Sequence, residues 1–157
     1  MRGKAIKKRV VKADTKYGNT DIAKFINYLM LGGKKSIAQR LMYGALSEIE
    51  TKMKKNPVEV FEEVITKIAP QVEVRSKRVG GANYQVPIPV RGERQFALAC
   101  RWIIGAARNI KGMPMSNKLA KVFMESYEGV GDAIKKRDDV HRMAEANKAF
   151  AHFARRR

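Results

Sequence analysis

Residues 72–90 read VEVRSKRVGGANYQVPIPV, two runs of alternating side chains on either side of four small or turn-forming residues, Gly80 to Asn83. The second run places four residues on one face: Tyr84, Val86, Ile88 and Val90. This pattern is typical of a β-hairpin. No other stretch of the chain has the pattern of a strand, so the hairpin is expected to stand alone.

The hairpin carries more positive charge than a structural turn requires. Its first strand holds three basic residues: Arg75, Lys77 and Arg78. Pro87 and Pro89 in the second strand suit an edge, and a lone two-stranded ribbon is marginal in water. We expect a basic arm, residues 72–90, that projects from a helical body and grips an anion. The alternative is an ordinary surface hairpin with solvated charges.

The composition indicates a polyanionic partner. The 157 residues suit one domain over residues 1–157, and 33 Lys and Arg against 15 Asp and Glu give a net charge of +18. A domain with this much charge repels itself, so nucleic acid is the first candidate partner and an acidic membrane surface the second. We find neither a signal peptide nor a membrane-spanning run and expect a cytoplasmic protein. The single cysteine, Cys100, suits a reducing compartment.

Apolar residues at helical spacing cover most of the remaining chain. The spacing predicts helices over residues 19–31, 35–54, 56–69, 92–110, 116–127 and 132–150. The expected buried stripe of the second helix is Ile37, Leu41, Ala45, Ile49 and Met53. That of the third is Val58, Phe61, Ile65 and Ile68. Asn56 and Ser116 are expected to cap their helices, and the fold class is mainly α.

Two further basic segments precede the hairpin. Residues 1–18 form a basic arm without apolar periodicity, which is either a solvated tail or an RNA-binding arm; its first cations are Arg2, Lys4, Lys7, Lys8 and Arg9. The second helix begins at Gly33, Lys34 and Lys35. The two lysines therefore lie at the end of the helix where the macrodipole is already positive. A phosphate bound there would be attracted by both the lysines and the helix N-terminus. The segment does not have the spacing of a Walker loop.

The helix over residues 92–110 is apolar around most of its circumference except for three arginines. Arg94, Arg101 and Arg108 follow a seven-residue step, which drifts by only about 20° on an ideal helix. They therefore form one basic stripe, with Arg91 and Lys111 at the two ends of the helix. The stripe faces RNA in our interpretation, and the alternative is that each arginine reaches solvent or pairs with a neighbouring acid.

The chain ends in a basic aromatic tail, residues 150–157, which can stack on single-stranded RNA or dock a partner protein. Five glutamates between residues 48 and 63 mark a surface expected to face away from a polyanion or to meet a basic protein.

Catalytic patterns are not found. If His141 and His152 shared a helix they would lie about 16 Å apart, too far to hold one metal ion. Cys100 lies in the most apolar helix and suits a buried position. We expect no enzymatic activity, no cofactor and no metal site, although an RNA-processing enzyme with scattered site residues is an alternative.

Four runs resemble a known family. They are INYLMLGGKKSIAQRLMYGA from Ile26, VEVRSKRVGGANYQV from Val72, LACRW from Leu98 and RMAEANKAFAH from Arg142. They look like the ribosomal protein seven family of the small subunit, in its bacterial form, and the resemblance extends from about Lys4 to Phe153. The hairpin run is the most specific of the four.

The resemblance implies a six-helix bundle with one protruding two-stranded β-hairpin and a basic N-terminal arm. It implies a structural protein that binds the 3′ major domain of small-subunit ribosomal RNA and nucleates assembly of the subunit head. It also implies a position near the decoding region and the exit-site transfer RNA, with contacts to small-subunit proteins nine and eleven and no membrane. The alternative is a general RNA- or DNA-binding architectural protein.

The resemblance and the charge pattern together assign residues to these contacts, and Arg108 and Lys111 come from the charge pattern alone. The RNA-binding set is Arg2, Lys4, Lys7, Lys8, Arg9, Gly33, Lys34, Lys35, Arg75, Lys77, Arg78, Arg91, Arg94, Arg101, Arg108 and Lys111. The set near transfer RNA or a partner protein is Gly80, Gly81, Asn83, Tyr84, Arg142, Asn147, Lys148, Phe150 and His152.

Overall fold

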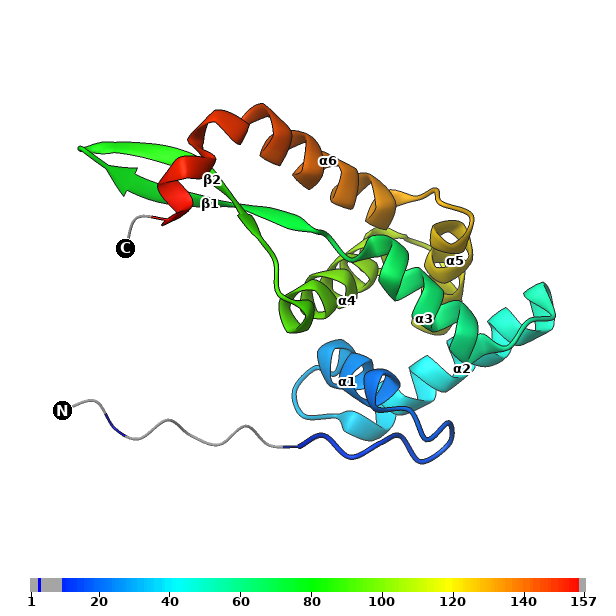
Figure 1. Cartoon of the computed structure of the whole chain (residues 1–157). Coiled ribbons are helices and arrows are strands. Elements are labelled where there is room, and N and C mark those ends of the chain that lie inside the picture. The colour runs from blue at the N-terminus through cyan, green and yellow to red at the C-terminus, as the bar shows by residue number, and fades with distance from the viewer. Residues whose placement is uncertain (1–2, 4–9, 156–157) are drawn as a thin grey trace. The chain divides into compact units, whose positions relative to one another are not determined.

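A computed structural model describes residue 3 and residues 10–155, so the predictions for Arg2, Lys4, Lys7, Lys8 and Arg9 lie outside the described residues. The chain divides into two compact units, Met1–Arg40 and Leu41–Arg157, which are described separately below. The expectation of a single domain stays a prediction. The mainly helical fold is confirmed, and the described residues form six α-helices, one two-stranded hairpin and a final 3₁₀ helix (Figure 1).

The first unit is built on α1, Thr20–Leu29. The Asn19 Oδ1 atom accepts hydrogen bonds from the N–H groups of Asp21 and Ile22, at 2.7 and 3.2 Å, which satisfies two of the donors left open at a helix start. The buried face matches the predicted spacing: Ile22, Ala23, Phe25, Ile26 and Leu29. The sequence pattern therefore located this helix correctly.

Helix α2, Lys35–Met53, begins as predicted but is rotated relative to the predicted stripe. Ile37 is 49% exposed, and the expectation that it is buried is wrong. Ala45 and Ile49 of the predicted stripe are buried as expected, together with Ala38, Met42 and Leu46. Leu41 and Met53 are only half-buried. Apolar residues occur on two adjacent rows of this helix, so the periodicity alone fits either row.

Helix α3, Pro57–Ile68, starts at Asn56, whose side chain accepts from the N–H of Val58 at 3.0 Å. Phe61 and Ile68 of the predicted stripe are buried as expected, while Val60 and Val64 are buried in place of the half-buried Val58 and Ile65. The predicted cap is confirmed, because an Asn side chain before a proline at the first helical position satisfies open donors without disturbing the helix.

The hairpin consists of β1, Val72–Val79, and β2, Ala82–Pro89, paired in antiparallel register from Val72 opposite Pro89 to Val79 opposite Ala82. The turn has two residues and not four, because Ala82 and Asn83 already pair with the first strand. Gly80 and Gly81 both have positive φ, at +57° and +91°, as a tight two-residue turn requires.

The remaining helices are α4, Gly92–Asn109, α5, Met115–Tyr127, and α6, Asp132–Ala146. Ser116 does not cap α5, because Pro114 occupies the cap position and the Ser116 hydroxyl donates to Asn117 instead. Helix α6 ends earlier than predicted. It is followed by a 3₁₀ helix, η1, Lys148–Arg155, in the region expected to be a tail.

The second unit has its core among the helices. Helix α5 packs on α3 and α4, and α6 packs on α4 and along β1 (Figure 1). The rings of Phe61 and Phe123 lie 5.8 Å apart in a tilted arrangement, and Ile103, Leu119 and Cys100 are fully buried near the middle of their helices. The buried position expected for Cys100 is confirmed.

The rotation of α2 gives a stability prediction. Met42→Ala should lower the free energy of unfolding by about 2–5 kcal/mol, because it leaves a cavity at a fully buried position. Ile37→Ala should change it by less than about 0.5 kcal/mol, as for other exposed sites. Urea denaturation of both variants measures this. Equal losses would contradict the observed helix phase.

Candidate nucleic-acid interface

The ribbon has an inner face and an outer face, and its basic residues are divided between them. Directly opposed residues share a face, so the register places Arg75 with Val86 and Lys77 with Tyr84 on the inner face. Val86 is fully buried there. Arg78 lies on the other face. The three cations of the predicted arm therefore do not form one continuous surface.

Glu73 anchors the base of the inner face. Its side chain is only 11% exposed and accepts from Arg75 Nε at 2.6 Å and from Arg94 Nε at 3.2 Å. The two arginine side chains are 59% and 44% exposed, so each guanidinium group keeps some of its N–H donors exposed to solvent. The carboxylate thus joins the ribbon to α4 and fixes two predicted RNA contacts. Sequence reasoning missed Glu73 because Arg94 lies 21 residues away.

Lys77 is partly committed within the protein. Its ammonium group donates to the backbone oxygen of Phe153 at 2.7 Å, and the residue is half-buried. Tyr84, opposite Lys77, contacts the rings of Phe150 and Phe153. Lys77 is therefore attached to the tail segment, and its contact with RNA stays a prediction.

Arg78 is the most open cation of the ribbon. It is exposed, lies opposite Asn83 beside the turn, and makes no ion pair among the residues that the structure describes. Gly80, Gly81 and Asn83 are exposed as well. On the same outer face, Gln85 donates to the Ser76 hydroxyl at 2.9 Å. The tip therefore presents a polar, cationic surface that offers donors to phosphates or to unpaired bases.

The stripe of arginines on α4 is exposed as its spacing predicted. Arg94, Arg101 and Arg108 all reach solvent, while the apolar residues between them fill the core. Arg91 and Lys111 are exposed at the two ends. Only Arg94 has an ion pair within the described part of the chain. The alternative of acid pairing thus applies to one arginine of the stripe, and RNA contact stays a prediction for all three.

A shallow hollow lies beside this stripe, between α4 and α6. It has a volume of about 270 Å³, and its wall includes Arg101, the half-buried Trp102 and Lys136. The wall also includes the acidic residue Asp132. The indole offers a stacking surface, and the two cations can pair with phosphates. The sequence analysis missed Trp102 and Lys136 as a pair because they come from helices 34 residues apart.

The start of α2 belongs to the first unit, and its lysines are exposed, but two of its N–H groups are already hydrogen-bonded within the chain. Gly33, Lys34 and Lys35 are exposed, and the first turn contains no acid that would offset the lysines. The N–H of Lys35 donates to the carbonyl of Gly33 at 2.9 Å, while the N–H of Lys34 donates to that of Leu31 at 3.1 Å. A phosphate at this position stays a prediction.

The C-terminal residues assigned to partner contacts serve several roles. Arg142 is exposed and lies 3.4 Å from Asp139, and Lys148 is exposed. The Asn147 amide caps α6 by donating to the Met143 carbonyl at 2.8 Å. Phe150 packs on Tyr84, and His152 Nδ1 lies 2.9 Å from the Ala149 carbonyl. Asn147 and Phe150 thus have structural roles in addition to the predicted ones.

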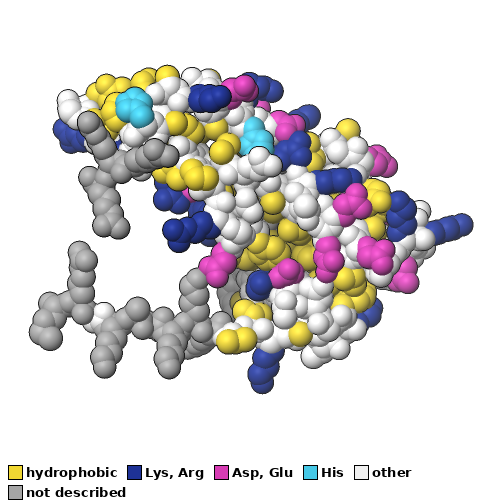
Figure 2. Space-filling model, viewed as in Figure 1, with side chains coloured by type: hydrophobic (Ala, Val, Ile, Leu, Met, Phe, Trp, Pro, Cys, Tyr) yellow, Lys and Arg dark blue, Asp and Glu magenta, His cyan; other side chains and the backbone are white. Residues whose placement is uncertain are grey.

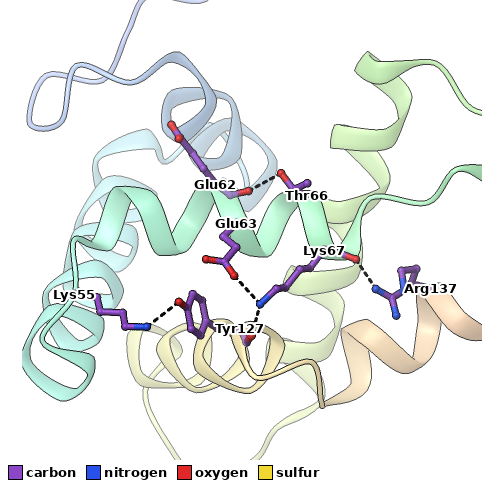
Figure 3. A network of polar contacts seen from close by, with 7 residues as sticks. All are labelled: Lys55, Glu62, Glu63, Thr66, Lys67, Tyr127 and Arg137. Carbon is purple, nitrogen blue, oxygen red and sulfur yellow. Dashed lines mark hydrogen bonds and ion pairs between the residues drawn. The ribbon is translucent and has the colours of Figure 1, made fainter.

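A polar network on the second unit holds three helices together (Figure 3). Lys67 donates to Glu63 at 2.7 Å and to the Tyr127 carbonyl at 2.6 Å, and Lys55 donates to the Tyr127 hydroxyl at 2.8 Å. Arg137 of α6 donates to the Lys67 carbonyl at the end of α3, at 2.6 Å. These cations are used for structure, so net charge overstates the number available to a polyanion.

The network shifts the pKa values of two side chains. The ammonium of Lys67 lowers the pKa of Glu63 by hydrogen bonding to its carboxylate. The hydrogen bond to the Tyr127 hydroxyl raises the pKa of Lys55. Both charged forms are thus favoured in the folded protein.

Acidic side chains gather over α3, with basic side chains close to them. Figure 2 shows this on the visible face, and Glu59, Glu62 and Glu63 are exposed on this helix. The expectation that the acidic segment faces away from a polyanion, or meets a basic protein, stays a prediction.

Two searches of the described residues bear on other classes of function. No helix there has both the length and the apolar character needed to cross a membrane. Within the same residues, no group of three or more His, Cys, Asp and Glu side chains is arranged to hold a metal ion.

Comparison with known proteins matches residues 1–148 to the family model described as ribosomal protein S7p/S5e. Relatives include the small ribosomal subunit protein uS7 of Burkholderia mallei (strain SAVP1), B. pseudomallei (strain 668) and B. multivorans (strain ATCC 17616 / 249). Each is 55% identical over 152 residues, which cover 97% of this chain and 97% of the relative.

The role of Glu73 gives a second stability prediction. Glu73→Ala should lower the free energy of unfolding by about 1 kcal/mol, because it removes a charge-assisted anchor whose partners are half exposed. Arg78→Ala should leave stability unchanged within about 0.5 kcal/mol. Thermal unfolding of both variants tests this, and a larger loss for Arg78→Ala would contradict the assignment of the two faces.

The pKa of Glu63 predicts a pH dependence. Because the folded-state pKa lies below the ordinary 4.5, the carboxylate contributes stability above 4.5 that is lost as the pH falls through the folded value. Glu63→Gln should therefore lose stability near neutral pH but show a smaller decrease on acidification.

Urea midpoints measured from neutral pH to about pH 3 would reveal this difference. Glu50→Gln, at an exposed carboxylate of α2, is the matched control. Parallel pH profiles for the wild-type chain and Glu63→Gln would contradict the role of the ion pair.

Proposed function

Because the chain belongs to the ribosomal protein S7p/S5e family, whose members are structural proteins of the small ribosomal subunit and not enzymes, we propose that it binds the 3′ major domain of small-subunit ribosomal RNA. In this proposal it nucleates assembly of the subunit head and lies near the decoding region and the exit-site transfer RNA. The observation that carries the proposal is the set of exposed cations on the ribbon tip and on α4.

The mechanism is binding without turnover. Arg78 beside the ribbon turn and Arg101 on α4 have no ion pair among the described residues, so their guanidinium groups can neutralise phosphates and release counterions. Arg75 and Arg94 are held in place by Glu73, which reduces the side-chain entropy lost when they bind.

Recognition relies mainly on the shape of the RNA backbone. The grooves of A-form RNA offer little sequence readout, and unpaired bases offer more. Trp102, which lines the same hollow as Arg101 and Lys136, is our candidate for stacking on such a base. Phosphate contacts then set position, and this indole adds local selectivity.

The C-terminal region supplies the proposed contacts to other components. Arg142, Lys148 and His152 are exposed, and η1, which carries Lys148 and His152, packs on β2 of the ribbon. We assign this region to the exit-site transfer RNA and to protein eleven, with protein nine as a further neighbour in the subunit head. The protein thus resides on cytoplasmic ribosomes in this proposal.

The proposal predicts a steep dependence of RNA binding on salt. Arg78→Ala combined with Arg101→Ala should reduce the slope of log affinity against log salt by about two, because each phosphate contact contributes a slope of nearly one. A fragment containing the 3′ major domain is titrated at several salt concentrations by filter binding.

Lys52→Ala combined with Lys135→Ala is the matched control. It removes two exposed charges that are not assigned to the interface, and Lys52 already pairs with Glu48. An equal change in slope for the control would mean that only net charge matters. Competition by duplex DNA as strong as by the fragment would favour a general nucleic-acid-binding protein.

A further inference from the structure

The ribbon lacks the support that a larger sheet would give it. Within the described part of the chain, β1 and β2 pair only with each other. A two-stranded hairpin of this kind is at best marginally stable in water. Its base is fixed by Glu73, by the buried Val86 and by a hydrogen bond from the Gln71 N–H to His141 Nε2 at 3.2 Å. Its middle needs a separate source of stability.

That middle is covered by the C-terminal 3₁₀ helix, which lies across β2 (Figure 1). The Tyr84 ring lies 5.1 Å from the Phe150 ring and 5.2 Å from the Phe153 ring, in tilted arrangements favoured by aromatic pairs. Directly across the ribbon from Tyr84, Lys77 donates to the Phe153 carbonyl at 2.7 Å. One segment therefore contacts both strands at the same level.

The covering segment is itself an unusual helix. It runs for eight residues with 3₁₀ geometry, whereas such helices rarely exceed three or four residues. Its outer positions, including Ala151, His152 and Ala154, are exposed. Phe150 and Phe153 are its large inward side chains. A helix with poor internal hydrogen bonds is stabilised here by its contacts with the ribbon.

We propose that the 3₁₀ helix Lys148–Arg155 is a brace that orders the ribbon in the free protein, and that tail and ribbon stabilise each other. The brace assigns order to the middle of the ribbon before any partner arrives. Mobility is then confined to the tip between Arg78 and Asn83, beyond the last contact with Phe150 and Phe153.

Backbone amide exchange in the full chain, without RNA, tests this directly. Phe150→Ala combined with Phe153→Ala should accelerate exchange of the ribbon amides between Ser76 and Gln85 by about tenfold or more. Exchange in α3, α4 and α5 should stay within about a factor of two. Ala151→Ser combined with Ala154→Ser, at exposed positions of the same helix, is the matched control and should change neither region.

A second variant removes the same aromatic contact from the ribbon side. Tyr84→Ala should accelerate exchange of the same amides, and adding it to the double tail variant should cause little further change, since both remove one shared contact. Unchanged ribbon exchange in the tail variant would overturn the proposal. Equal acceleration of the helical core would do so as well, because the tail would then stabilise the whole unit and not the ribbon.

Discussion

A two-stranded ribbon buries too little surface to hold its own shape, and much of the second unit can be understood as the means of holding it. At the base, the Glu73 carboxylate binds Arg75 of the strand and Arg94 of α4. Along one side, α6 packs against β1. The inner face then carries the side chains that attach the ribbon, which leaves Arg78 and the turn on the surface available to a ligand.

The same constraint decides how the positive charge is used. Lys67 and Arg137 close polar contacts at the ends of α3 and α5, and Lys77 reaches the tail. A net charge of +18 is therefore not a count of RNA contacts. The cations that remain exposed include Arg78 at the ribbon tip and Arg101 on α4. The regular backbone of the helix lowers the conformational entropy lost when Arg101 binds a phosphate.

Local patterns in the sequence predicted the helices and strands well, but predicted less well which face of each helix is buried. The hairpin, the Asn19 and Asn56 helix starts and the fold class follow from short-range chemistry, and these agree with the structure. The buried row of α2 does not follow from short-range chemistry. Ile37 and Ala38 satisfy the same periodicity, and only tertiary packing selects between them.

The site was predictable to the same extent. Exposed cations at a turn and at seven-residue spacing can be read from the sequence. Contacts between residues far apart in the chain, such as Glu73 with Arg94 or Tyr84 with Phe150, cannot. The shift from an α-helix to a 3₁₀ helix after Asn147 depends on those same contacts, so the sequence predicted a basic aromatic tail without its structure.

Hydroxyl-radical footprinting of small-subunit ribosomal RNA, with and without this protein at two salt concentrations, tests the central claim most directly. Specific recognition by a fixed set of exposed cations predicts a compact footprint in the 3′ major domain that persists at moderate salt. Diffuse protection that disappears as salt is raised would show that the charge gives only non-specific affinity, and would contradict the account.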